Sequence, residues 1–411
     1  MKLLAYLDTQ GRTDAVGHVF VHVRRGRQTG AFSYDNDYLS QPTAYAIDPA
    51  LPLGGGTWPT GGPLPRAFLD AAPDRWGRNL IDRRAAAQPA KTGVAPRRLT
   101  DVDYLLGVSD AARQGALRFR TSPEGPFEHP GDEVPKLVAL PALVAASRSV
   151  ILDDADAAAA LKTLLDVGSA SLGGARPKAS VQDGGRLYVA KFPHPHDEWA
   201  VMAWEATALD IAVRAGVQTP PHRLVDVGGQ AALLVERFDR TPDGQRVGYI
   251  SALTLCEADD GDRRDYLDVA ERLGALSAAP QADLNELWRR IMVGIAINNT
   301  DDHLRNHGLV RVSRGWRLSP VFDINPNLDT RTAHVSPIAG ATASQPAAAA
   351  LMDTAEFFGL TATRAKEIVH EIAEATMTWE AVAAANNIPQ AEIRRFAPVF
   401  SRGIQTLTSI T

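Results

Sequence analysis

The chain has 411 residues, which is long enough for two or three domains with sizeable cores. Its net charge of −5 argues against a protein that grips nucleic acid by itself, and its single cysteine, Cys256, excludes an internal disulfide and any cysteine-rich metal site. No apolar run approaches the length that crosses a bilayer, and Asp8 interrupts the N-terminus before a signal-peptide core could form, so we expect a cytoplasmic protein.

The N-terminal part of the chain alternates short apolar segments with turns. Alternating valines in residues 17–26 predict a strand, because successive side chains of a strand point to opposite faces. An apolar stripe in residues 73–87 predicts a helix. The residues expected to be buried are Val19, Val21 and Val23 in the strand and Trp76, Leu80 and Ile81 in the helix.

Two changes in composition divide the rest of the chain. Residues 121–135 are rich in proline, glycine and acidic residues, which is typical of a connection between domains. From about residue 247 onward, helical patterns replace strand patterns. We therefore predict an N-terminal subdomain (1–120), a second subdomain (136–245) and a helical C-terminal lobe (246–411).

Two elements are predicted next along the chain. An alanine-rich helix is expected over residues 153–165, with Asp153 and Asp154 in its first turn, where the helix dipole favours acidic side chains. A hairpin is expected in the second half of residues 166–192, with Asp183-Gly184-Gly185 as its turn.

Lys191 lies at the end of this hairpin and shares a strand face with Leu187 and Val189. The ammonium group of a lysine at this position either extends into solvent or binds an anion, and most strand lysines are solvated. A further apolar strand over residues 232–240 turns polar abruptly at "ERFDR", as a hinge between two lobes would.

The C-terminal half is mainly helical. Helices are predicted over residues 199–217 and 283–297, and the chain from about 345 to 411 is expected to be helical throughout. One hairpin interrupts the helices, with strands over 308–312 and 316–318 and Ser313-Arg314-Gly315 as its turn.

Residues 298–310, "NNTDDHLRNHGLV", concentrate hydrogen-bonding side chains directly after an apolar helix. Helix capping and turn formation would explain these side chains. A phosphoryl-transfer loop is the more specific alternative. We expect His303 and His307 to orient this loop by hydrogen bonds, and nothing in the sequence requires them as zinc ligands.

Phosphoryl transfer needs a cradle over the phosphates, a cation, magnesium ligands and an acid that receives or orients the attacking hydroxyl. The chain carries a candidate for each part, in the order found in kinases. The cradle would be residues 168–178, to which Lys178 adds a charge. Lys191 is the candidate phosphate-binding lysine, Glu205 is its candidate partner, and Glu198 is the fallback.

Asp301 and Asn306 have the spacing of the aspartate and asparagine in the protein-kinase catalytic loop. Asp323 follows the later hairpin, where the second metal-binding acid of a kinase would stand. Because a hairpin brings its ends together, we expect Asn306 and Asp323 to face one another across a single Mg²⁺ site. The adjacent Asp302 is an alternative catalytic acid, and the spacing favours Asp301.

Together these motifs resemble the HipA family, the serine/threonine-kinase toxins of bacterial toxin–antitoxin modules. The resemblance covers nearly the whole chain and implies an α+β, protein-kinase-like fold. That fold has a mixed α/β N-terminal part with a β-rich subdomain and an all-helical C-terminal lobe. The matching segments are "FSYDNDYL", "PDRWGRNLI", "DYLLGVSDAARQGALRF", "GSASLGGARPKAS", "VAKF", "VERFDR", "NNTDDHLRNHG" and "LSPVFDINP".

The resemblance also implies roles for individual residues. Asp301 would be the catalytic aspartate, and Asn306 and Asp323 would bind Mg²⁺. Family members phosphorylate a serine of their own glycine-rich loop, for which Ser171 and Ser169 are the candidates. The residues implied to contact ATP are Lys191, Ser171, Gly173, Gly174, Lys178, Glu236, Phe238 and His303.

The function implied is that of an ATP- and Mg²⁺-dependent serine/threonine protein kinase that acts as a toxin. Its target would be an aminoacyl-tRNA synthetase and its partner a small DNA-binding antitoxin, with no direct binding of nucleic acid or membrane. A small-molecule phosphotransferase on the same scaffold is one alternative. The other is a non-catalytic ATP-binding partner of the antitoxin, which predicts the loss of a metal ligand or of the lysine, and neither is missing.

Overall fold

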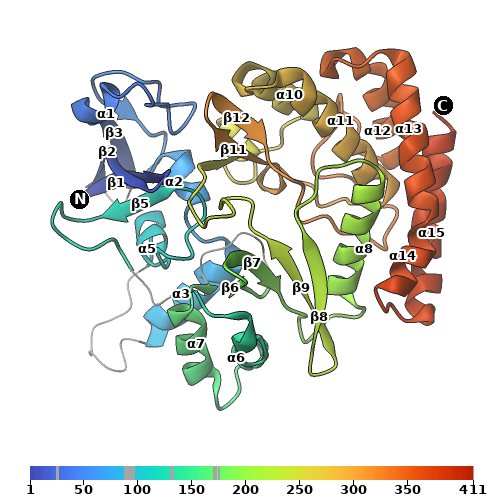
Figure 1. Cartoon of the computed structure of the whole chain (residues 1–411), viewed down its shortest axis with the longest axis horizontal. Coiled ribbons are helices and arrows are strands. Elements are labelled where there is room, and N and C mark those ends of the chain that lie inside the picture. The colour runs from blue at the N-terminus through green and yellow to red at the C-terminus, as the bar shows by residue number, and fades with distance from the viewer. Residues whose placement is uncertain (25–26, 88–97, 130–133, 170–173, 175, 411) are drawn as a thin grey trace. The chain divides into compact units, whose positions relative to one another are not determined.

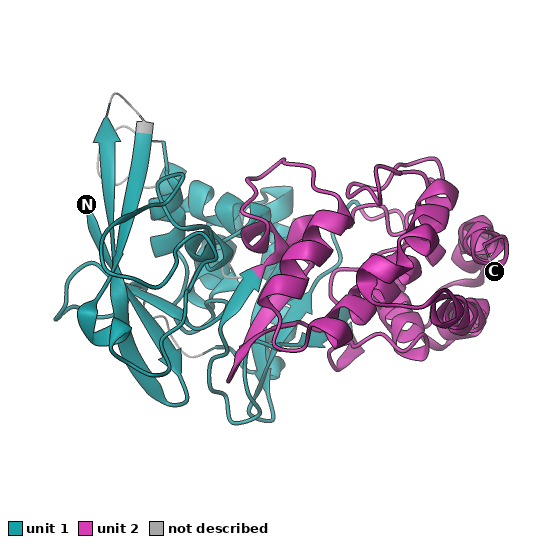
Figure 2. Ribbon diagram, turned by 90° about the horizontal axis from the view of Figure 1, so that it is seen from above, with its two compact units in different colours: residues 1–196, 226–250 teal, residues 197–225, 251–411 magenta. Residues whose placement is uncertain are grey.

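The computed structural model describes residues 1–24, 27–87, 98–129, 134–169, 174 and 176–410 (Figure 1). The chain forms two compact units (Figure 2). Unit 1 consists of residues 1–196 and 226–250, and unit 2 of residues 197–225 and 251–411. Each unit therefore contains segments that are distant in the sequence.

Unit 1 begins with an antiparallel sheet of strand order β4-β3-β2-β1-β5. Its strands are β1 (Lys2–Thr9), β2 (Arg12–Arg24), β3 (Arg27–Tyr34), β4 (Trp58–Pro59) and β5 (Leu117–Arg120). The strand predicted over 17–26 is confirmed and begins earlier. Val19 and Val21 are buried as predicted, but Val23 is 68% exposed. The pairing of β1 with β2 ends at Phe20, so Val23 lies where only β3 flanks the strand.

The described helices of unit 1 cover three stretches of the chain. They are α1 (Asn36–Leu39), α2 (Arg66–Asp70), α3 (Arg75–Ala87), α5 (Asp101–Leu106), η1 (Leu137–Ala139), α6 (Leu140–Leu152) and α7 (Ala157–Asp166). The helix predicted over 73–87 is confirmed, and its predicted apolar stripe is buried in α3.

The start of the helix predicted over 153–165 is wrong. The apolar segment before Asp153 forms a helix of its own, α6, which the sequence analysis does not predict. Asp153 ends that helix in the left-handed conformation (φ 55°), and α7 begins only at Ala157. Asp153 and Asp154 therefore lie in the connection between two helices and not in the first turn of one.

A second sheet has the strand order β6-β7-β9-β8. Its strands are β6 (Lys178–Asp183), β7 (Arg186–Lys191), β8 (His222–Val227), within which the boundary of the units falls, and β9 (Gln230–Glu236). The predicted hairpin is confirmed, because Asp183 pairs with Arg186 across Gly184 and Gly185. Both glycines have positive φ (54° and 81°), as the tight turn of a two-residue hairpin requires.

Unit 2 is helical apart from a small sheet of order β10-β11-β12. Its elements are α8 (Val201–Arg214), β10 (Tyr249–Ser251, across the unit boundary), α9 (Ala252–Leu255), α10 (Tyr266–Leu276), α11 (Pro280–Ala296), η3 (Leu304–Asn306), β11 (Gly308–Val312), β12 (Gly315–Leu318), α12 (Ser344–Asp353), η4 (Ala355–Phe358), α13 (Ala362–Met377), α14 (Trp379–Ala385) and α15 (Gln390–Thr408). These confirm the predicted helices and the hairpin, except that Val312 pairs with Gly315, so only Ser313 and Arg314 form the turn.

Aromatic rings hold the helices of unit 2 together. Trp204 of α8 stacks on Phe396 of α15 with ring centroids 3.9 Å apart, and Trp379 of α14 stacks on Phe400 at 4.4 Å. All four rings are buried, and burial of such large apolar surfaces is a main source of stability. These stacked rings therefore hold α8, α14 and α15 together in the helical core of unit 2.

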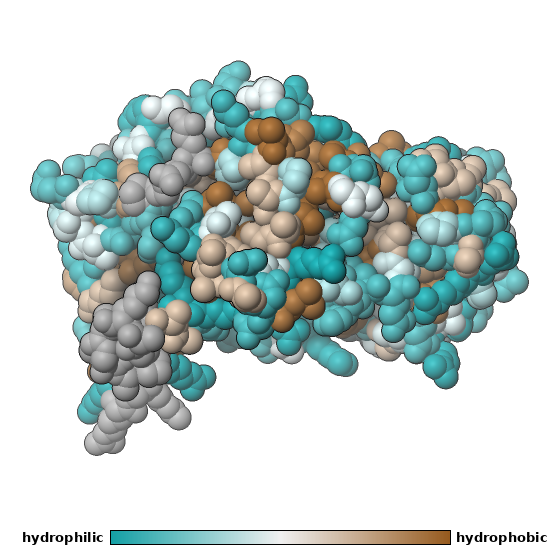
Figure 3. All heavy atoms as spheres, turned by 90° about the horizontal axis from the view of Figure 1, so that it is seen from below, coloured by the Kyte–Doolittle hydropathy of each residue, from teal (hydrophilic) through white to brown (hydrophobic). Residues whose placement is uncertain are grey.

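The exposed surface is mixed in character. On the face shown in Figure 3, hydrophilic residues cover most of the surface and hydrophobic residues form smaller patches between them. Among the described residues, no helix is both long and apolar enough to cross a membrane.

Candidate functional site

Two lysines lie opposite each other in the central hairpin of unit 1. Lys178 of β6 pairs in register with Lys191 of β7, so both side chains lie on one face of the sheet. They are only 2% and 8% exposed. The Asp74 carboxylate lies 3.8 Å from the Lys178 ammonium group. Lys191 is therefore not a solvated strand lysine, and two neighbouring buried cations make this face suitable for an anion.

Gly168 and Gly174 are the described glycines of the predicted phosphate cradle, and Gly174 is the one that lies against Lys178. It has φ +102°, and a Cβ atom there would collide with the Lys178 ammonium group. The absence of a side chain therefore allows the cradle backbone to lie directly against this lysine. The predicted contacts Ser171 and Gly173 lie outside the described residues.

Ser169, the second candidate for autophosphorylation, is fully buried. Its hydroxyl group has no hydrogen-bond partner among the described residues. In the described conformation this hydroxyl group is therefore not exposed at the surface.

The predicted hinge leaves β9 at Glu236. The Glu236 carboxylate forms an ion pair with Arg186 at 3.0 Å, and the Arg237 amide donates to the carbonyl oxygen of Leu187. The Phe238 ring lies 6.1 Å from the ring of Tyr249. Arg186 therefore occupies the carboxylate of Glu236, and Leu187 occupies the amide of Arg237.

Both candidate partners of Lys191 lie in unit 2. Glu205 is on α8 and is 1% exposed, whereas Glu198 is 73% exposed and lies 3.4 Å from Arg395. A buried carboxylate needs cationic or hydrogen-bonding partners, while an exposed one does not. Glu205 is therefore the better candidate of the two.

Asparagine side chains fasten the start of the loop after α11. Asn298 donates from its side chain to the carbonyl oxygen of Asn327 at 2.7 Å, and the Asn327 amide donates back at 3.0 Å. The Asn327 side chain donates to the Thr300 hydroxyl at 2.7 Å, and the Asn325 amide donates to Asn299 Oδ1 at 3.3 Å. Residues 298–300 and 325–327 are thus fixed side by side.

The two adjacent acids of the loop have different surroundings. Tyr266 donates its hydroxyl hydrogen to Asp302 at 2.5 Å, and His307 Nε2 lies 3.0 Å from the other Asp302 oxygen. Burial raises the pKa of Asp302, but His307 and Tyr266 outweigh it and the net pKa is lowered. Asp301 is exposed, and no hydrogen bond of its carboxylate to another described residue is observed. Asp302 therefore holds the loop, and Asp301 faces solvent.

The two histidines of the loop differ in their hydrogen bonds. His307 is 2% exposed and also lies 3.1 Å from the Tyr266 hydroxyl, so it orients the loop by hydrogen bonds as predicted. His303 precedes η3, and its Nδ1 atom is buried without a hydrogen-bond partner among the described residues.

Asn306 and Asp323 flank the β11–β12 hairpin. The Asn306 side-chain amide donates to the carbonyl oxygen of Asp301 at 3.1 Å, which leaves its Oδ1 atom to act as a ligand. Ser319 donates its amide to the carbonyl oxygen of Gly308 at 2.8 Å, so the two ends of the hairpin lie together. Asp323 has φ +58°, a left-handed conformation that is costly outside glycine and is concentrated at functional sites.

The donor types at these two positions fit Mg²⁺. An amide oxygen and a carboxylate suit a hard cation that keeps waters and substrate phosphates in its remaining positions. Among the described residues, no cluster of three or more histidine, cysteine or acidic side chains could hold a metal by itself. Asn306 and Asp323 therefore have the donor types of Mg²⁺ ligands.

The side chains that support these groups were not predicted from the sequence. Tyr266 lies 36 positions before Asp302, and no spacing rule connects them. Arg237 and Asp239 belong to the recognised "ERFDR" motif, but their buried ion pair at 2.7 Å was not predicted. The signal in the sequence was the presence of four charged residues among the five of this motif.

The family model for the HipA-like C-terminal domain matches residues 170–379, which is half of the chain. The chain belongs to the HipA family. The matched residues include cradle residues 174 and 176–178, both lysines, the hinge and the whole loop after α11.

Comparison with individual proteins agrees with this assignment. The chain is 27% identical over 161 residues to "Putative kinase Y4dM" of Sinorhizobium fredii and 24% identical over 147 residues to "Putative kinase Y4mE" of the same organism. These matches cover 34% and 33% of this chain, and they span only 37% and 33% of the two relatives.

A solved structure covers almost the whole chain. HipA of Shewanella oneidensis, determined with HipB and its operator DNA, superposes with a TM-score of 0.67 over 99% of this chain and 97% of its own, at 17% identity. This similarity confirms the predicted α+β, HipA-type fold.

Proposed function

We propose that this HipA family member is an ATP- and Mg²⁺-dependent serine/threonine protein kinase that acts as a toxin. The observation that carries the proposal is the contrast between Asp301 and Asp302. One acid, Asp302, is largely buried, with 13% of its side chain exposed, and is held by Tyr266 and His307, while the other is exposed on the same loop. A kinase needs this arrangement, because the acid that receives the substrate proton must be fixed in position and open to the substrate.

In the proposed reaction, the hydroxyl oxygen of a serine or threonine bonds to the γ-phosphorus of ATP. The bond from that phosphorus to the β,γ-bridging oxygen breaks, ADP leaves, and the hydroxyl proton passes to the Asp301 carboxylate. Mg²⁺ held by Asn306 Oδ1 and the Asp323 carboxylate would neutralise phosphate charge when bound. Asp302 keeps the loop in place and takes no proton.

The residues of unit 1 would bind the nucleotide. Lys178 and Lys191 contribute two buried positive charges for phosphates, and Gly174 lets the cradle backbone approach them. The hinge backbone from Glu236 to Phe238 would contact the adenine. Two residues of unit 2 are also proposed to take part: His303 as a further ATP contact and Glu205 as the partner of Lys191.

Autophosphorylation is proposed to act on the cradle at Ser171 or Ser169. Because Ser169 is buried, its phosphorylation would fix the cradle in an opened form that no longer covers a nucleotide. We propose an aminoacyl-tRNA synthetase as the protein target. The HipA structure from Shewanella contains HipB and operator DNA, which supports a small DNA-binding antitoxin as the partner here.

The direct test measures intact mass after purified protein is incubated with Mg²⁺ and ATP. We expect a gain of one or two phosphates that map to Ser171 or Ser169 and are absent in the Asp301→Asn variant. Asp329→Asn is the matched control, because Asp329 is an exposed aspartate of the same unit that pairs only locally, with Arg331 at 3.1 Å. A phosphate gain that persists in Asp301→Asn would remove Asp301 from the mechanism.

The same sample tests the non-catalytic alternative. If neither the chain nor an added protein substrate gains phosphate, a titration with ATP separates an ATP-binding protein without activity from one that does not bind ATP. Phosphate found on a metabolite and never on protein would favour the small-molecule phosphotransferase.

A further inference from the structure

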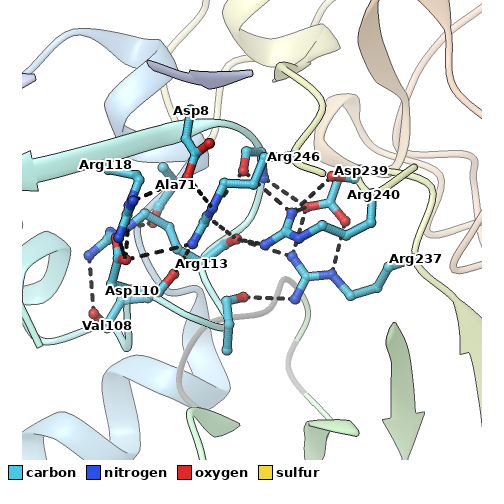
Figure 4. A network of polar contacts seen from close by, with 12 residues as sticks. Asp8, Ala71, Val108, Asp110, Arg113, Arg118, Arg237, Asp239, Arg240 and Arg246 are labelled. Atoms are coloured by element: carbon cyan, nitrogen blue, oxygen red, sulfur yellow. Dashed lines mark hydrogen bonds and ion pairs between the residues drawn. The ribbon is translucent and has the colours of Figure 1, made fainter. Parts of the chain in front are cut away.

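A buried network of charged side chains connects the N-terminal part of unit 1 to the hinge (Figure 4). Five guanidinium groups and three carboxylates take part, and most of them are almost fully buried. They are Arg113, Arg118, Arg237, Arg240, Arg246, Asp8, Asp110 and Asp239. We call this set the arginine cluster.

The hinge side of the cluster is Arg237. Its guanidinium group donates to both oxygens of Asp239, at 2.9 and 2.7 Å, and to the Ser180 hydroxyl of β6 at 3.0 Å. It also donates to the carbonyl oxygens of Ala112 and Arg113, at 2.7 and 3.2 Å. A residue between the two proposed adenine-contacting positions is therefore bound to a loop more than 120 positions earlier in the chain.

Several backbone groups of that loop, residues 110–116, form hydrogen bonds to the segment after β9. Gly115 donates its amide to Asp239 at 2.7 Å. Arg240 donates to the carbonyl oxygen of Arg113 at 2.8 Å, and Arg246 donates to the carbonyl oxygen of Asp110. Because these are buried charge-assisted hydrogen bonds, they fix the loop and the hinge segment relative to each other.

The loop is in turn fixed to the N-terminal part by Arg113 and Asp110. The fully buried Arg113 donates to the carbonyl oxygens of Ala71, Leu105 and Val108, each at 3.0 Å. Arg118 of β5 binds the Asp110 carboxylate at 2.5 Å.

The cluster is also electrostatically unusual. Its five guanidinium groups exceed its three carboxylates, and carbonyl oxygens of the loop supply the remaining negative potential. Burial lowers the pKa of Arg113 and of Arg240 to about 9, so both remain charged at neutral pH. Such a cluster is sensitive to the position of each backbone carbonyl, because an unpaired buried charge is strongly unfavourable.

We propose that the N-terminal part, residues 1–120, acts through the arginine cluster to hold the hinge in the conformation that binds the adenine nucleotide. Arg246 is a positioning residue in this account. Its guanidinium group donates to the carbonyl oxygens of Asp110, Arg113 and Gly115, in the loop to which Arg237 is bound. The role in nucleotide binding rests on the proposed function. The mechanical coupling of the loop to the hinge does not depend on it.

The test uses the full chain with Arg246→Met, and with Arg120→Met as the matched control. Arg120 lies two positions after Arg118 on β5, where it stacks on the Tyr6 and Phe127 rings and donates to the carbonyl oxygen of Pro123. It shares the Phe127 ring with Arg118, but its described hydrogen bond lies outside the cluster. Affinities for ATP and for adenosine are measured by calorimetry at a temperature where thermal melting shows all proteins to be folded. Hydrogen exchange is followed in the amides of residues 230–240.

We expect Arg246→Met to weaken the binding of both ATP and adenosine about tenfold and to speed exchange in the hinge. Arg120→Met should lower the melting temperature and leave both affinities and hinge exchange unchanged. Equal hinge exchange in Arg246→Met and the unaltered protein would overturn the coupling. Faster hinge exchange with unchanged nucleotide affinity would overturn the proposed role in binding. If the unaltered protein binds no adenine compound, the proposed function fails, and the exchange data still decide the coupling.

Discussion

Tyr266 and Asp302 are joined by a short buried hydrogen bond of 2.5 Å between the phenol oxygen and Asp302 Oδ2. Tyr266 begins α10, and its own amide donates to the carbonyl oxygen of Pro337. The Ser336 hydroxyl donates to the carbonyl oxygen of Asp302 at 2.7 Å. The Tyr266 bond therefore connects the loop of Asp301 to a helix that precedes it, and the Ser336 bond connects the same loop to a segment that follows it.

Tyr266→Phe removes only the hydroxyl group of this pair. We expect the free energy of unfolding to fall by about 1–3 kcal/mol, because a buried carboxylate loses a donor. Phosphoryl transfer should slow by roughly tenfold to a hundredfold through misplacement of Asp301, with little change in KM for ATP. Urea denaturation and steady-state kinetics measure the two effects.

Tyr104→Phe is the matched control, because the Tyr104 hydroxyl donates to Asp82 at 2.7 Å in an exposed pair. Its stability should change by less than about 0.5 kcal/mol and its activity not at all. Equal effects of the two variants would show that the burial of Asp302 has no special role.

The lowered pKa of Asp302 predicts a pH dependence of stability. Burial raises this pKa, but His307 and Tyr266 bring it below its ordinary value of 3.8. The unfolded chain therefore binds the proton more readily than the folded chain does. The stabilising contribution of Asp302 is complete well above pH 3.8 and is lost as the pH falls through the folded-state pKa.

Urea denaturation of the unaltered protein and of Asp302→Asn measures this contribution. We expect the difference in unfolding free energy to be largest near neutral pH and to shrink below about pH 4. A difference that stays constant down to the acid limit of the folded state would contradict the proposed charge of Asp302.

Asp301→Asn and Asp302→Asn should differ in what they damage. Asp301 is exposed, so its substitution is expected to change the unfolding free energy by less than about 0.5 kcal/mol. It should reduce phosphoryl transfer by about a hundredfold to ten-thousandfold. Asp302→Asn should reduce both stability and activity. Thermal melting and a phosphate-transfer assay on both variants separate the roles, and the reverse pattern would make Asp302 the catalytic acid.

Local sequence patterns predicted much of the fold. The hairpin of β6 and β7 followed from its Gly184-Gly185 turn, and the helices of unit 2 followed from their apolar stripes. The connection at Asp153 could not be predicted, because a helix that ends in the left-handed conformation and one that begins with acidic residues have similar sequences.

In the candidate site, too, some features were predicted from local sequence patterns and others were not. The positions of Lys191, Asp301, Asn306 and Asp323 came from spacing along the chain, and spacing is a local property. The supporting contact of Tyr266 with Asp302, like those of the arginine cluster with residues 110–116, joins distant segments. Only the folded chain shows which buried charge is held by which partner.

Gly174→Ala tests the phosphate side of the proposed site. Gly174 has φ +102°, and an alanine Cβ would collide with the ammonium group of Lys178. Gly56→Ala is the matched control, because Gly56 has a similar φ of +113° and open space around its Cβ position. Both variants carry the same kind of backbone strain, of about 1–3 kcal/mol, but only Gly174→Ala moves a lysine that is proposed to bind phosphate.

We therefore expect Gly174→Ala to weaken ATP binding about tenfold or more and to leave adenosine binding nearly unchanged, because the adenine contacts lie elsewhere. Gly56→Ala should leave both affinities unchanged. Calorimetric titration of both variants with ATP and adenosine measures this. An equal loss for ATP and adenosine would show that Gly174 acts on the whole nucleotide site and not on Lys178.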